Sequence, residues 1–539
     1  MSHNRAEILT LLARRVNSFS EGYRQNIALL GEPCIGKTSL IKQLLESEDI
    51  KKGPIIPIYT ETKIEPFEFC AKRFIKSALF QLIHSDPTMA QPNDAVVLIE
   101  DIRRQYPKTA ETCQRVLRDI EKGKIDEAYS YMLDIPSAIY EESKKRCLLI
   151  LDEFHNLENF TIKHSFGTLA KKIMIQKDTM FLLVSSKNTL AQRLLAEKLS
   201  LLFGNFEKIF MPPFDTGMSR SFLQDILRNM SMPQVYMDFI SSFTGNKPFY
   251  MRVICDEIER AIFSGKVGRN DYQGLIEQAF TESVFKKNGV INNLFSSFFF
   301  RVSDGRFLSH SASVLIALSS ENKKQHEITK SAKLQGRDCS RVLNSLVDMD
   351  IIARNGSLYR FRERLFAFWL KSVYMKRIMS FSIDESIEEQ CFRKDVLGNL
   401  NAFMLEFEKE LTSRIEDLFR LFKNDVIQLN GRRHKFLSFS SVRRLEKPLC
   451  GGASFMAASG KINWLFTLKK EPVIESDISD IIKEVKNKKN NARINRNIII
   501  ALSGINENAY LMAKEAGFWV WDIDSVNVLM DLYGKPHVY

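Results

Sequence analysis

An apolar run that ends in glycine, followed after four residues by Gly-Lys-Thr, constrains this 539-residue chain more than any other feature. Residues 26–30, NIALL, have the length and composition of a buried parallel strand. Residues 39–47, SLIKQLLES, repeat their apolar side chains at helical spacing. Between them, GEPCIGKT matches the phosphate-binding P-loop pattern, in which glycines let backbone N–H groups wrap a phosphate at a helix N-terminus. The sequence therefore predicts a nucleotide site on an α/β fold.

The loop residues have distinct expected roles. Lys37 would reach the β- and γ-phosphates of ATP, and the Thr38 hydroxyl would bind Mg²⁺. We expect the nucleotide to be held by the whole loop, namely Gly31, Glu32, Pro33, Cys34, Ile35, Gly36, Lys37, Thr38 and Ser39.

A second apolar run ends in two carboxylates. Residues 148–151 of RCLLILDEFHNL run directly into Asp152 and Glu153. A strand buried on both faces would deliver these side chains to its C-terminal end, where parallel sheets bind ligands. We expect Asp152 to hold Mg²⁺ through water and Glu153 to orient or deprotonate the attacking water.

Two further segments complete the predicted sheet. TMFLLVSSK, residues 179–187, reads as a strand whose terminal Ser185 positions the water or senses the γ-phosphate; plain turn chemistry is the alternative. GPIIPIYTET, residues 53–62, supplies one more strand, so the sheet alternates with helices as in a doubly wound fold. Residues 65–145 are too long for one connection, and we expect a mostly helical insertion there.

These segments together resemble a known family. NRAEILTLL, NIALLGEPCIGKTSL, LILDEFHNL, LLVSS and FTGNKPFYMRVI are similar to archaeal-type P-loop ATPases, relatives of the AAA+ and STAND groups, over about residues 1–375. The resemblance implies a helical lid at 213–300, whose Gly-Asn-Lys-Pro segment would bring Pro248 to the nucleotide. Asn205 stands where the family often has an arginine, so Arg193 and Arg252 remain as basic candidates or as surface residues.

The middle of the chain reads as a winged helix. With the ATPase core at 1–212, residues 301–380 give three helices and then a hairpin, for which the Asn-Gly dipeptide at 355–356 is a strong signal. The third helix of such a unit can enter a major groove. Arg337, Arg341 and Arg354 could contact DNA, or the unit could pack against the ATPase core.

Residues 385–539 resemble the PD-(D/E)xK nuclease fold, a known partner of these ATPases. The metal-binding Glu-x-Lys of that fold falls on Thr467-Leu468-Lys469, and the preceding strand, GGASFMAAS, has no aspartate. We therefore expect a domain that does not cut. Its basic run could bind nucleic acid or lie solvated; it comprises Lys483, Lys486, Lys488, Lys489, Arg493 and Arg496.

Composition adds limits. No apolar run approaches the ~18 residues that span a membrane, and the first residues lack the apolar core of a signal peptide. Eight cysteines without a C-x-x-C pair indicate reduced thiols in a cytoplasm. A net charge of +12 is compatible with nucleic-acid contact.

The preferred interpretation is a cytoplasmic ATP-hydrolysing switch or remodelling ATPase, with Mg²⁺ as cofactor and DNA as a plausible partner. A homo-oligomer or a protein partner is also possible on this interpretation. One alternative is an ATP-gated DNA endonuclease that uses other acids, such as Glu406, Glu408 or Glu471. The other is a protein–protein signalling ATPase without nucleic acid.

Overall fold

The structure, a computed structural model, describes residues 3–51, 53–83, 94–199, 206–303, 308–320, 323–379, 385–446, 448, 451–488 and 494–538. The chain forms two compact units. Unit 1 comprises Met1–Phe222, Lys247–Tyr250 and Asp348–Asp350; unit 2 comprises Leu223–Asn246, Met251–Val347 and Ile351–Tyr539.

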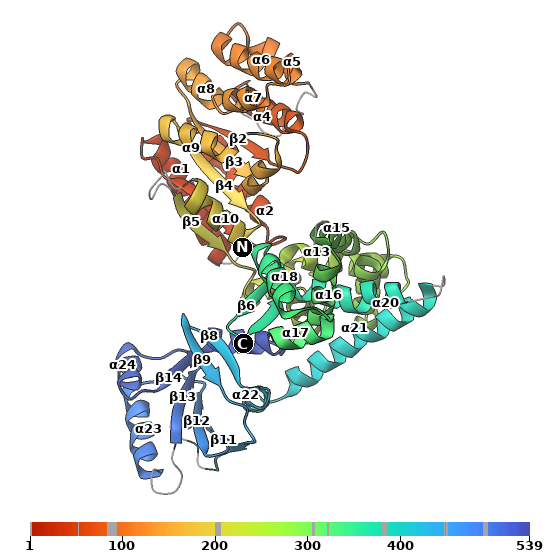
Figure 1. The fold of residues 1–539 in the computed structure, drawn as a ribbon, viewed down its shortest axis with the longest axis vertical. Coiled ribbons are helices and arrows are strands. Elements are labelled where there is room, and N and C mark those ends of the chain that lie inside the picture. Colours follow the sequence, from red (N-terminus) through yellow and green to blue (C-terminus); the bar gives the residue numbers. More distant parts are fainter. Residues whose placement is uncertain are drawn as a thin grey trace. The chain divides into compact units, whose positions relative to one another are not determined.

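Unit 1 contains a five-stranded sheet in which every neighbouring pair is parallel (Figure 1). The order across the sheet is β2 (Ile55–Glu61), β3 (Arg146–Asp152), β4 (Thr179–Ser185), β1 (Asn26–Gly31) and β5 (Phe206–Met211). This is the expected P-loop α/β fold. The strand order places β4 between β1 and β3, so the loop after β1 and the carboxylates after β3 flank the end of β4.

The strands of this sheet are buried on both faces because their alternate side chains enter two separate cores. Ala28 and Leu30 of β1 lie in one core, with residues of α4 to α10. Ile27 and Leu29 lie in the other, with residues of α1 and α2. The helices are α1 (His3–Ser20), α2 (Lys37–Glu46), α3 (Glu48–Lys51), α4 (Phe67–Ile83), α5 (Ala95–Ile102), α6 (Pro107–Glu121), α7 (Ile125–Met132), α8 (Ile135–Ser143), α9 (Ser165–Ile175), α10 (Asn188–Arg193) and α11 (Thr216–Ile226).

The long segment between β2 and β3 is helical in its described part. It contains α4 to α8, and α4 shows why: Cys70, Phe74 and Ala78 are buried at helical spacing on one side of it. The insertion packs into the same core as one face of the sheet.

Unit 2 begins with helices and adds a three-helix and hairpin element. The hairpin is β6 (Ile352–Asn355) and β7 (Leu358–Phe361). Asn355 is still paired within the ladder, to Leu358, so the two-residue turn is Gly356-Ser357, with φ of +61° at Gly356. The helices up to this point and just beyond it are α12 (Gln234–Phe243), α13 (Pro248–Phe263), α14 (Tyr272–Phe280), α15 (Val290–Ser303), α16 (Leu308–Ser319), α17 (Gln325–Ala332), α18 (Gly336–Asp348), α19 (Arg364–Trp369) and α20 (Met375–Met379).

The C-terminal part of unit 2 is built on a mixed sheet. β10, β11 and β12 are antiparallel, whereas β13 and β14 run parallel to β12. Helix α22 and the hairpin β8–β9 contribute to the core on one face, and α23 and α24 to the core on the other. The elements are α21 (Glu385–Glu408), α22 (Leu411–Arg420), β8 (Asp425–Leu429), β9 (Arg432–Phe436), β10 (Ser441–Arg444), β11 (Ala453–Ser459), β12 (Ile462–Lys469), α23 (Glu475–Lys488), β13 (Ile494–Ala501), α24 (Glu507–Glu515), β14 (Trp519–Asp522) and α25 (Ile523–Leu532).

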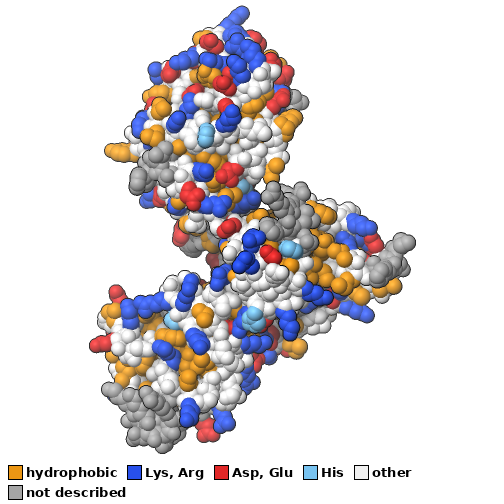
Figure 2. Space-filling model, in the orientation of Figure 1, with side chains coloured by type: hydrophobic (Ala, Val, Ile, Leu, Met, Phe, Trp, Pro, Cys, Tyr) orange, Lys and Arg blue, Asp and Glu red, His pale blue; other side chains and the backbone are white. Residues whose placement is uncertain are grey.

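Two features of the surface bear on partners. Within the part of the chain that the structure describes, no helix has the length and apolarity that crossing a membrane requires. Lys and Arg side chains are scattered over the visible face in Figure 2 and interspersed with acidic ones. The net positive charge therefore does not by itself locate a binding surface.

Candidate functional site

The loop between β1 and α2 has the backbone of a phosphate cradle. Cys34 and Gly36 adopt positive φ angles of 66° and 92°, and a turn with such angles lets successive backbone N–H groups face an anion. Gly31 has no room for a side chain, because a Cβ there would lie 2.4 Å from the Ile35 Cδ1 and 2.8 Å from the Met211 carbonyl. Ile35 is fully buried and anchors the loop.

Lys37 begins α2 and folds back over the loop. Its Nζ donates to the Gly31 carbonyl at 3.0 Å and to the Glu32 carbonyl at 2.8 Å. The side chain is 5 % exposed, and this burial lowers the pKa of Lys37, although the charges of Glu153 and Asp152 oppose the effect. A cation held by neutral carbonyls beside a row of N–H groups fits an anionic phosphate.

Thr38, in the first turn of α2, contacts Asp152, the last residue of β3. The Thr38 hydroxyl donates to the Asp152 Oδ2 at 2.9 Å, although the two residues are 114 positions apart in sequence. Asp152 is 2 % exposed, and its Oδ2 also accepts from the Tyr59 hydroxyl at 2.9 Å. An exposed hydroxyl and a carboxylate within hydrogen-bond distance are oxygen ligands that fit a shared Mg²⁺. Pro33 on the loop and Ser39 in the first turn of α2, both also expected at the nucleotide, are exposed.

Glu153 adopts a left-handed conformation, with φ of 55°, and reaches toward the end of β4. Its Oε2 accepts from the Ser186 amide at 2.9 Å and from the Ser186 hydroxyl at 2.7 Å. Burial raises the pKa of Glu153, while Lys37 and the bonds from Ser186 work against that rise. The carboxylate is therefore a stronger base than an exposed glutamate.

Ser185, expected to position water, instead faces the interior. It is fully buried, and its hydroxyl lies 2.8 Å from the His155 Nδ1. The neighbouring Ser186 is the serine that contacts Glu153. Successive side chains of a strand point to opposite sides, so the sequence alone could not decide between the two serines.

His155 is a site residue that the sequence reasoning missed. It is 4 % exposed, and its Nδ1 lies 3.3 Å from the Glu153 Oε2. Burial, together with the charges of Lys187 and Lys37, lowers the pKa of His155 to about 3. The imidazole is therefore neutral near pH 7, and it links Ser185 to Glu153. The signal was its position three residues after Asp152 in DEFH.

Lys247, Pro248 and Phe249, which belong to unit 1, lie against the loop. Pro248 lies on the side of Gly36 where a side chain would project, since a Cβ built on Gly36 would be 3.8 Å from the Pro248 Cγ. The Phe249 amide donates to the Cys34 carbonyl at 3.4 Å. Lys247, which the sequence reasoning also missed, is 2 % exposed, with its Nζ 3.1 Å from the Glu32 carboxylate. A second buried cation therefore lies beside the phosphate cradle.

Arg5 of α1 links the loop to the segment that follows β5. Its Nη2 donates to the Ile35 carbonyl at 3.0 Å and to the Pro212 carbonyl at 2.8 Å. Burial lowers the pKa of Arg5 to about 10. No sequence signal marked this residue, because its partners are backbone atoms of distant segments.

Two of the basic candidates in the ATPase region can be placed. Arg252 pairs with Asp256 at 2.8 Å within its own helix. Arg193 is exposed at the end of α10, and Asn205 lies outside the described residues.

The end of β12 differs from the end of β3. The Lys469 Nζ lies 2.6 Å from the Asp477 Oδ2, and the two side chains are 15 % and 12 % exposed. Thr467 is buried. Lys469 is thus paired rather than solvated. Across the described residues, no three His, Cys, Asp or Glu side chains come together as a metal site.

The remaining residues considered for metal or nucleic-acid binding in residues 385–539 are paired, exposed or not among the described residues. Glu406, an alternative acid, is bound by Lys409 at 2.8 Å and by Lys535 at 2.9 Å. Glu408 and Glu471 are exposed. In the basic run, Lys483 lies 3.3 Å from Asp480, and Arg496 lies over the Trp519 ring. Lys489 and Arg493, and the side chains of Lys486 and Lys488, fall outside the described part.

No protein-family model matches the sequence, and no curated protein matches it either. Among solved structures, a Walker-type ATPase of Pyrococcus abyssi is similar with a TM-score of 0.46 and 16% identity, covering 66% of this chain and 94% of that one. The ORC2 protein of Aeropyrum pernix, in ADPNP–ADP complexes, gives 0.44 and 15%, covering 75% and 95%. AMPPCP-bound DnaA of Aquifex aeolicus gives 0.33 and 11%, covering 65% and 89%.

Proposed function

We propose that this chain binds Mg²⁺–ATP at the loop of residues 31–39 and hydrolyses it. The observation that carries the proposal is the 2.9 Å contact between the Thr38 hydroxyl and the Asp152 carboxylate, beside a buried Lys37. A loop that merely connected a strand to a helix would have no need to bring these three groups together.

The protein groups have separable roles in this proposal. Thr38 and Asp152 would hold Mg²⁺, and the ion would supply positive charge against the phosphates of the nucleotide. Lys37 exchanges its bonds to the loop carbonyls for bonds to phosphate. Glu153 accepts a proton from the attacking water, and Ser186 fixes the orientation of its carboxylate.

Replacing Lys37 with alanine tests the proposal. We expect Lys37→Ala to lose ATP binding in equilibrium titrations and ATP hydrolysis in steady state. Lys42→Ala is the matched control, because Lys42 is exposed on the same helix. Wild-type hydrolysis by Lys37→Ala would refute the proposal.

We also infer that nucleotide state is relayed to unit 2 through residues 247–250. These four residues belong to unit 1, whereas the chain on both sides of them belongs to unit 2. Lys247 contacts Glu32 and Phe249 contacts Cys34, so phosphate entering the loop acts on the first turn of α13. The chain is on this proposal a nucleotide-driven switch or remodelling ATPase.

Limited proteolysis tests the relay. We expect a non-hydrolysable ATP analogue to change cleavage within unit 2 of the wild type, and Lys247→Met to remove that change while still binding the analogue. Lys266→Met, a substitution of an exposed lysine in unit 2, should respond like the wild type. A Lys247→Met variant with the wild-type response would contradict the relay.

We propose that the C-terminal domain does not cut nucleic acid. Asp477 neutralises Lys469, and Thr467 stands where the nuclease-like pattern needs an acid. Incubating the protein and duplex DNA with Mg²⁺ or Mn²⁺, with and without ATP, tests this. We expect intact DNA in every condition, and cleavage would favour the endonuclease alternative.

A further inference from the structure

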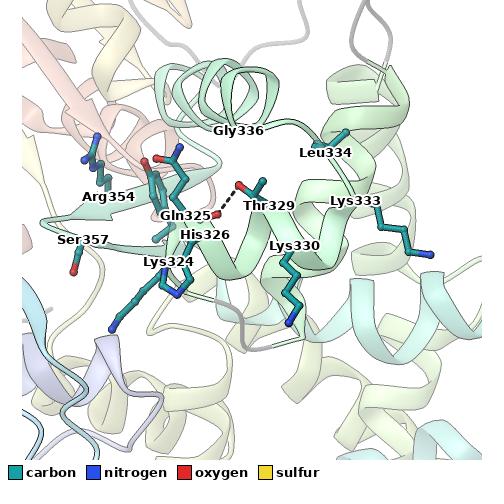
Figure 3. A pocket seen from close by; sticks show the side chains of 11 residues that line it. Lys324, Gln325, His326, Thr329, Lys330, Lys333, Leu334, Gly336, Arg354 and Ser357 are labelled. Carbon is teal, nitrogen blue, oxygen red and sulfur yellow. Dashed lines mark hydrogen bonds between the residues drawn. The ribbon is translucent and has the colours of Figure 1, made fainter.

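A pocket of about 730 Å³ lies between α17 and the β6–β7 hairpin (Figure 3). Its lining carries five basic side chains and no carboxylate. The basic residues are Lys324, His326, Lys330, Lys333 and Arg354. Such a concentration of one sign contrasts with the face drawn in Figure 2, where acidic and basic side chains are interspersed.

Two of the five basic side chains have acidic neighbours among the described residues. The Lys324 Nζ lies 2.8 Å from the Asp425 carboxylate, and the charges of His326 and Lys324 act on Glu327. Lys330 and Lys333 are exposed, and neither forms an ion pair with any residue that the structure describes. Arg354 donates to the Gly356 carbonyl at 3.1 Å and lies over the Tyr359 ring. Like charges brought together repel, and a bound anion would relieve that repulsion.

The tip of the β6–β7 hairpin packs against strand β8. The Asn355 side chain accepts from the Gln428 amide at 2.6 Å and donates to the Gln428 carbonyl at 3.1 Å. The Ser357 amide donates to the Val426 carbonyl at 2.7 Å. Gly356 approaches so closely that a Cβ there would lie 1.9 Å from the Val426 carbonyl. This tip cannot enter a groove of a duplex while it lies against β8.

Helix α18 is a weaker candidate for contacting a polyanion. Arg337 and Arg341 are exposed on it, but so is Asp348, and Arg341 lies 3.7 Å from Asp338. Its positive charges are thus partly cancelled along the same helix.

We propose that the pocket between α17 and the hairpin binds successive phosphates of a nucleic-acid backbone. The labelled cations lie around the pocket and do not converge on one point: Lys330 extends from α17, Lys333 from the turn that follows this helix, and Arg354 from β6 (Figure 3). That spread fits an extended chain of phosphates better than a single small anion. The residues that line this pocket are not those of the nucleotide loop. The proposed contacts are with the phosphates of the nucleic acid, so we expect binding to be independent of base sequence and sensitive to salt.

Lys330→Gln with Lys333→Gln tests the proposal. The measurement is the binding of a fluorescently labelled DNA duplex of mixed sequence to the full chain, followed by fluorescence anisotropy over a range of salt concentrations. We expect weaker binding at every salt concentration, with the slope of log K against log salt reduced by about 2, roughly one per lost phosphate contact. Lys330→Arg with Lys333→Arg should bind like the wild type.

The control makes the same change of charge elsewhere. Lys171→Gln with Lys177→Gln alters two exposed lysines of unit 1 and should leave both affinity and slope unchanged. ATP hydrolysis, measured on all variants, should not change, which separates this site from the nucleotide site.

Several results would overturn the assignment. The pocket variant could bind like the Lys171/Lys177 control, or Arg337→Gln with Arg341→Gln could abolish binding while the pocket variant retains it. Failure of the wild type to bind a duplex at low salt, or capture of an acidic polypeptide in preference to a duplex, would also contradict it.

Discussion

Two strand ends, that of β3 in unit 1 and that of β12 in the C-terminal sheet, occupy comparable places and have opposite chemistry. Each belongs to a strand with a parallel neighbour, where ligands of such sheets bind. After β3, Asp152 and Glu153 receive Thr38, Tyr59 and Ser186 from three other segments. After β12, Lys469 is neutralised by the helix that follows it. The difference is that the carboxylates at the end of β3 are held by hydroxyl groups and keep their charge available for a ligand, whereas the charge of Lys469 is neutralised by an ion pair.

The largest expected effect separates these two strand ends by activity. Glu153→Gln should lower kcat for ATP hydrolysis by about 10²–10⁴-fold with little change in ATP affinity, because it removes the proton acceptor and keeps the shape. Asp477→Asn, the matching acid-to-amide change in the helix residue that pairs with Lys469, should leave kcat unchanged. Steady-state kinetics on both variants checks this. A similar loss in both would mean that the two regions are not distinct.

The second prediction concerns stability at the β12 end. Asp477→Asn leaves the ammonium group of Lys469 largely buried without a carboxylate partner, so we expect a loss of about 2 kcal/mol in the free energy of unfolding. Lys469→Met in the same chain should recover part of that loss. Thermal unfolding of the single and double variants measures the coupling. An unchanged melting temperature for Asp477→Asn would show that the pair is not structural.

The third prediction tests the buried histidine after β3. Because the pKa of His155 is about 3 in the folded chain against an ordinary 6.5, the unfolded chain takes up a proton between these values and the folded chain does not. Stability therefore falls as the pH falls from 6.5 toward 3, by about 1.4 kcal/mol per pH unit. His155→Gln should lose less stability between pH 7 and pH 5 than the wild type does in denaturant titrations. Parallel losses would contradict a neutral buried His155.

The smallest expected effect is a shift in a pH–rate profile. The Ser186 hydroxyl donates to Glu153 and so favours its charged form. Ser186→Ala removes that bond and raises the pKa of Glu153 further. The acidic limb of the kcat profile should then move to higher pH. An acidic limb that stays in place would show that Glu153 does not control it.

The sequence was most informative where local patterns decide the structure. Four apolar runs became β1 to β4, and the loop of residues 31–38 took the expected backbone. Their signals are short-range: apolar length, glycine at a tight approach, and a helical repeat after Lys37.

The remainder of the site depends on contacts between distant segments. Tyr59 contacts Asp152 although the two are 93 positions apart in the sequence, and Lys247 contacts Glu32 although it follows the last strand of the sheet. No local sequence pattern predicts either contact. Ser186 rather than Ser185 meets Glu153 because of strand alternation, which shifts with a single residue of register. At the hairpin, the turn moved by one residue to Gly356-Ser357, where the tip meets β8.

The most direct test of the central claim is the rate of Mg²⁺-dependent ATP hydrolysis by the wild type and by Asp152→Ala. The geometry at Thr38 and Asp152 predicts hydrolysis by the wild type that stops when Mg²⁺ is chelated, and almost none by Asp152→Ala at any Mg²⁺ concentration. Equal, Mg²⁺-dependent rates for the two proteins would contradict the assignment of this strand end as the ATP-hydrolysing site.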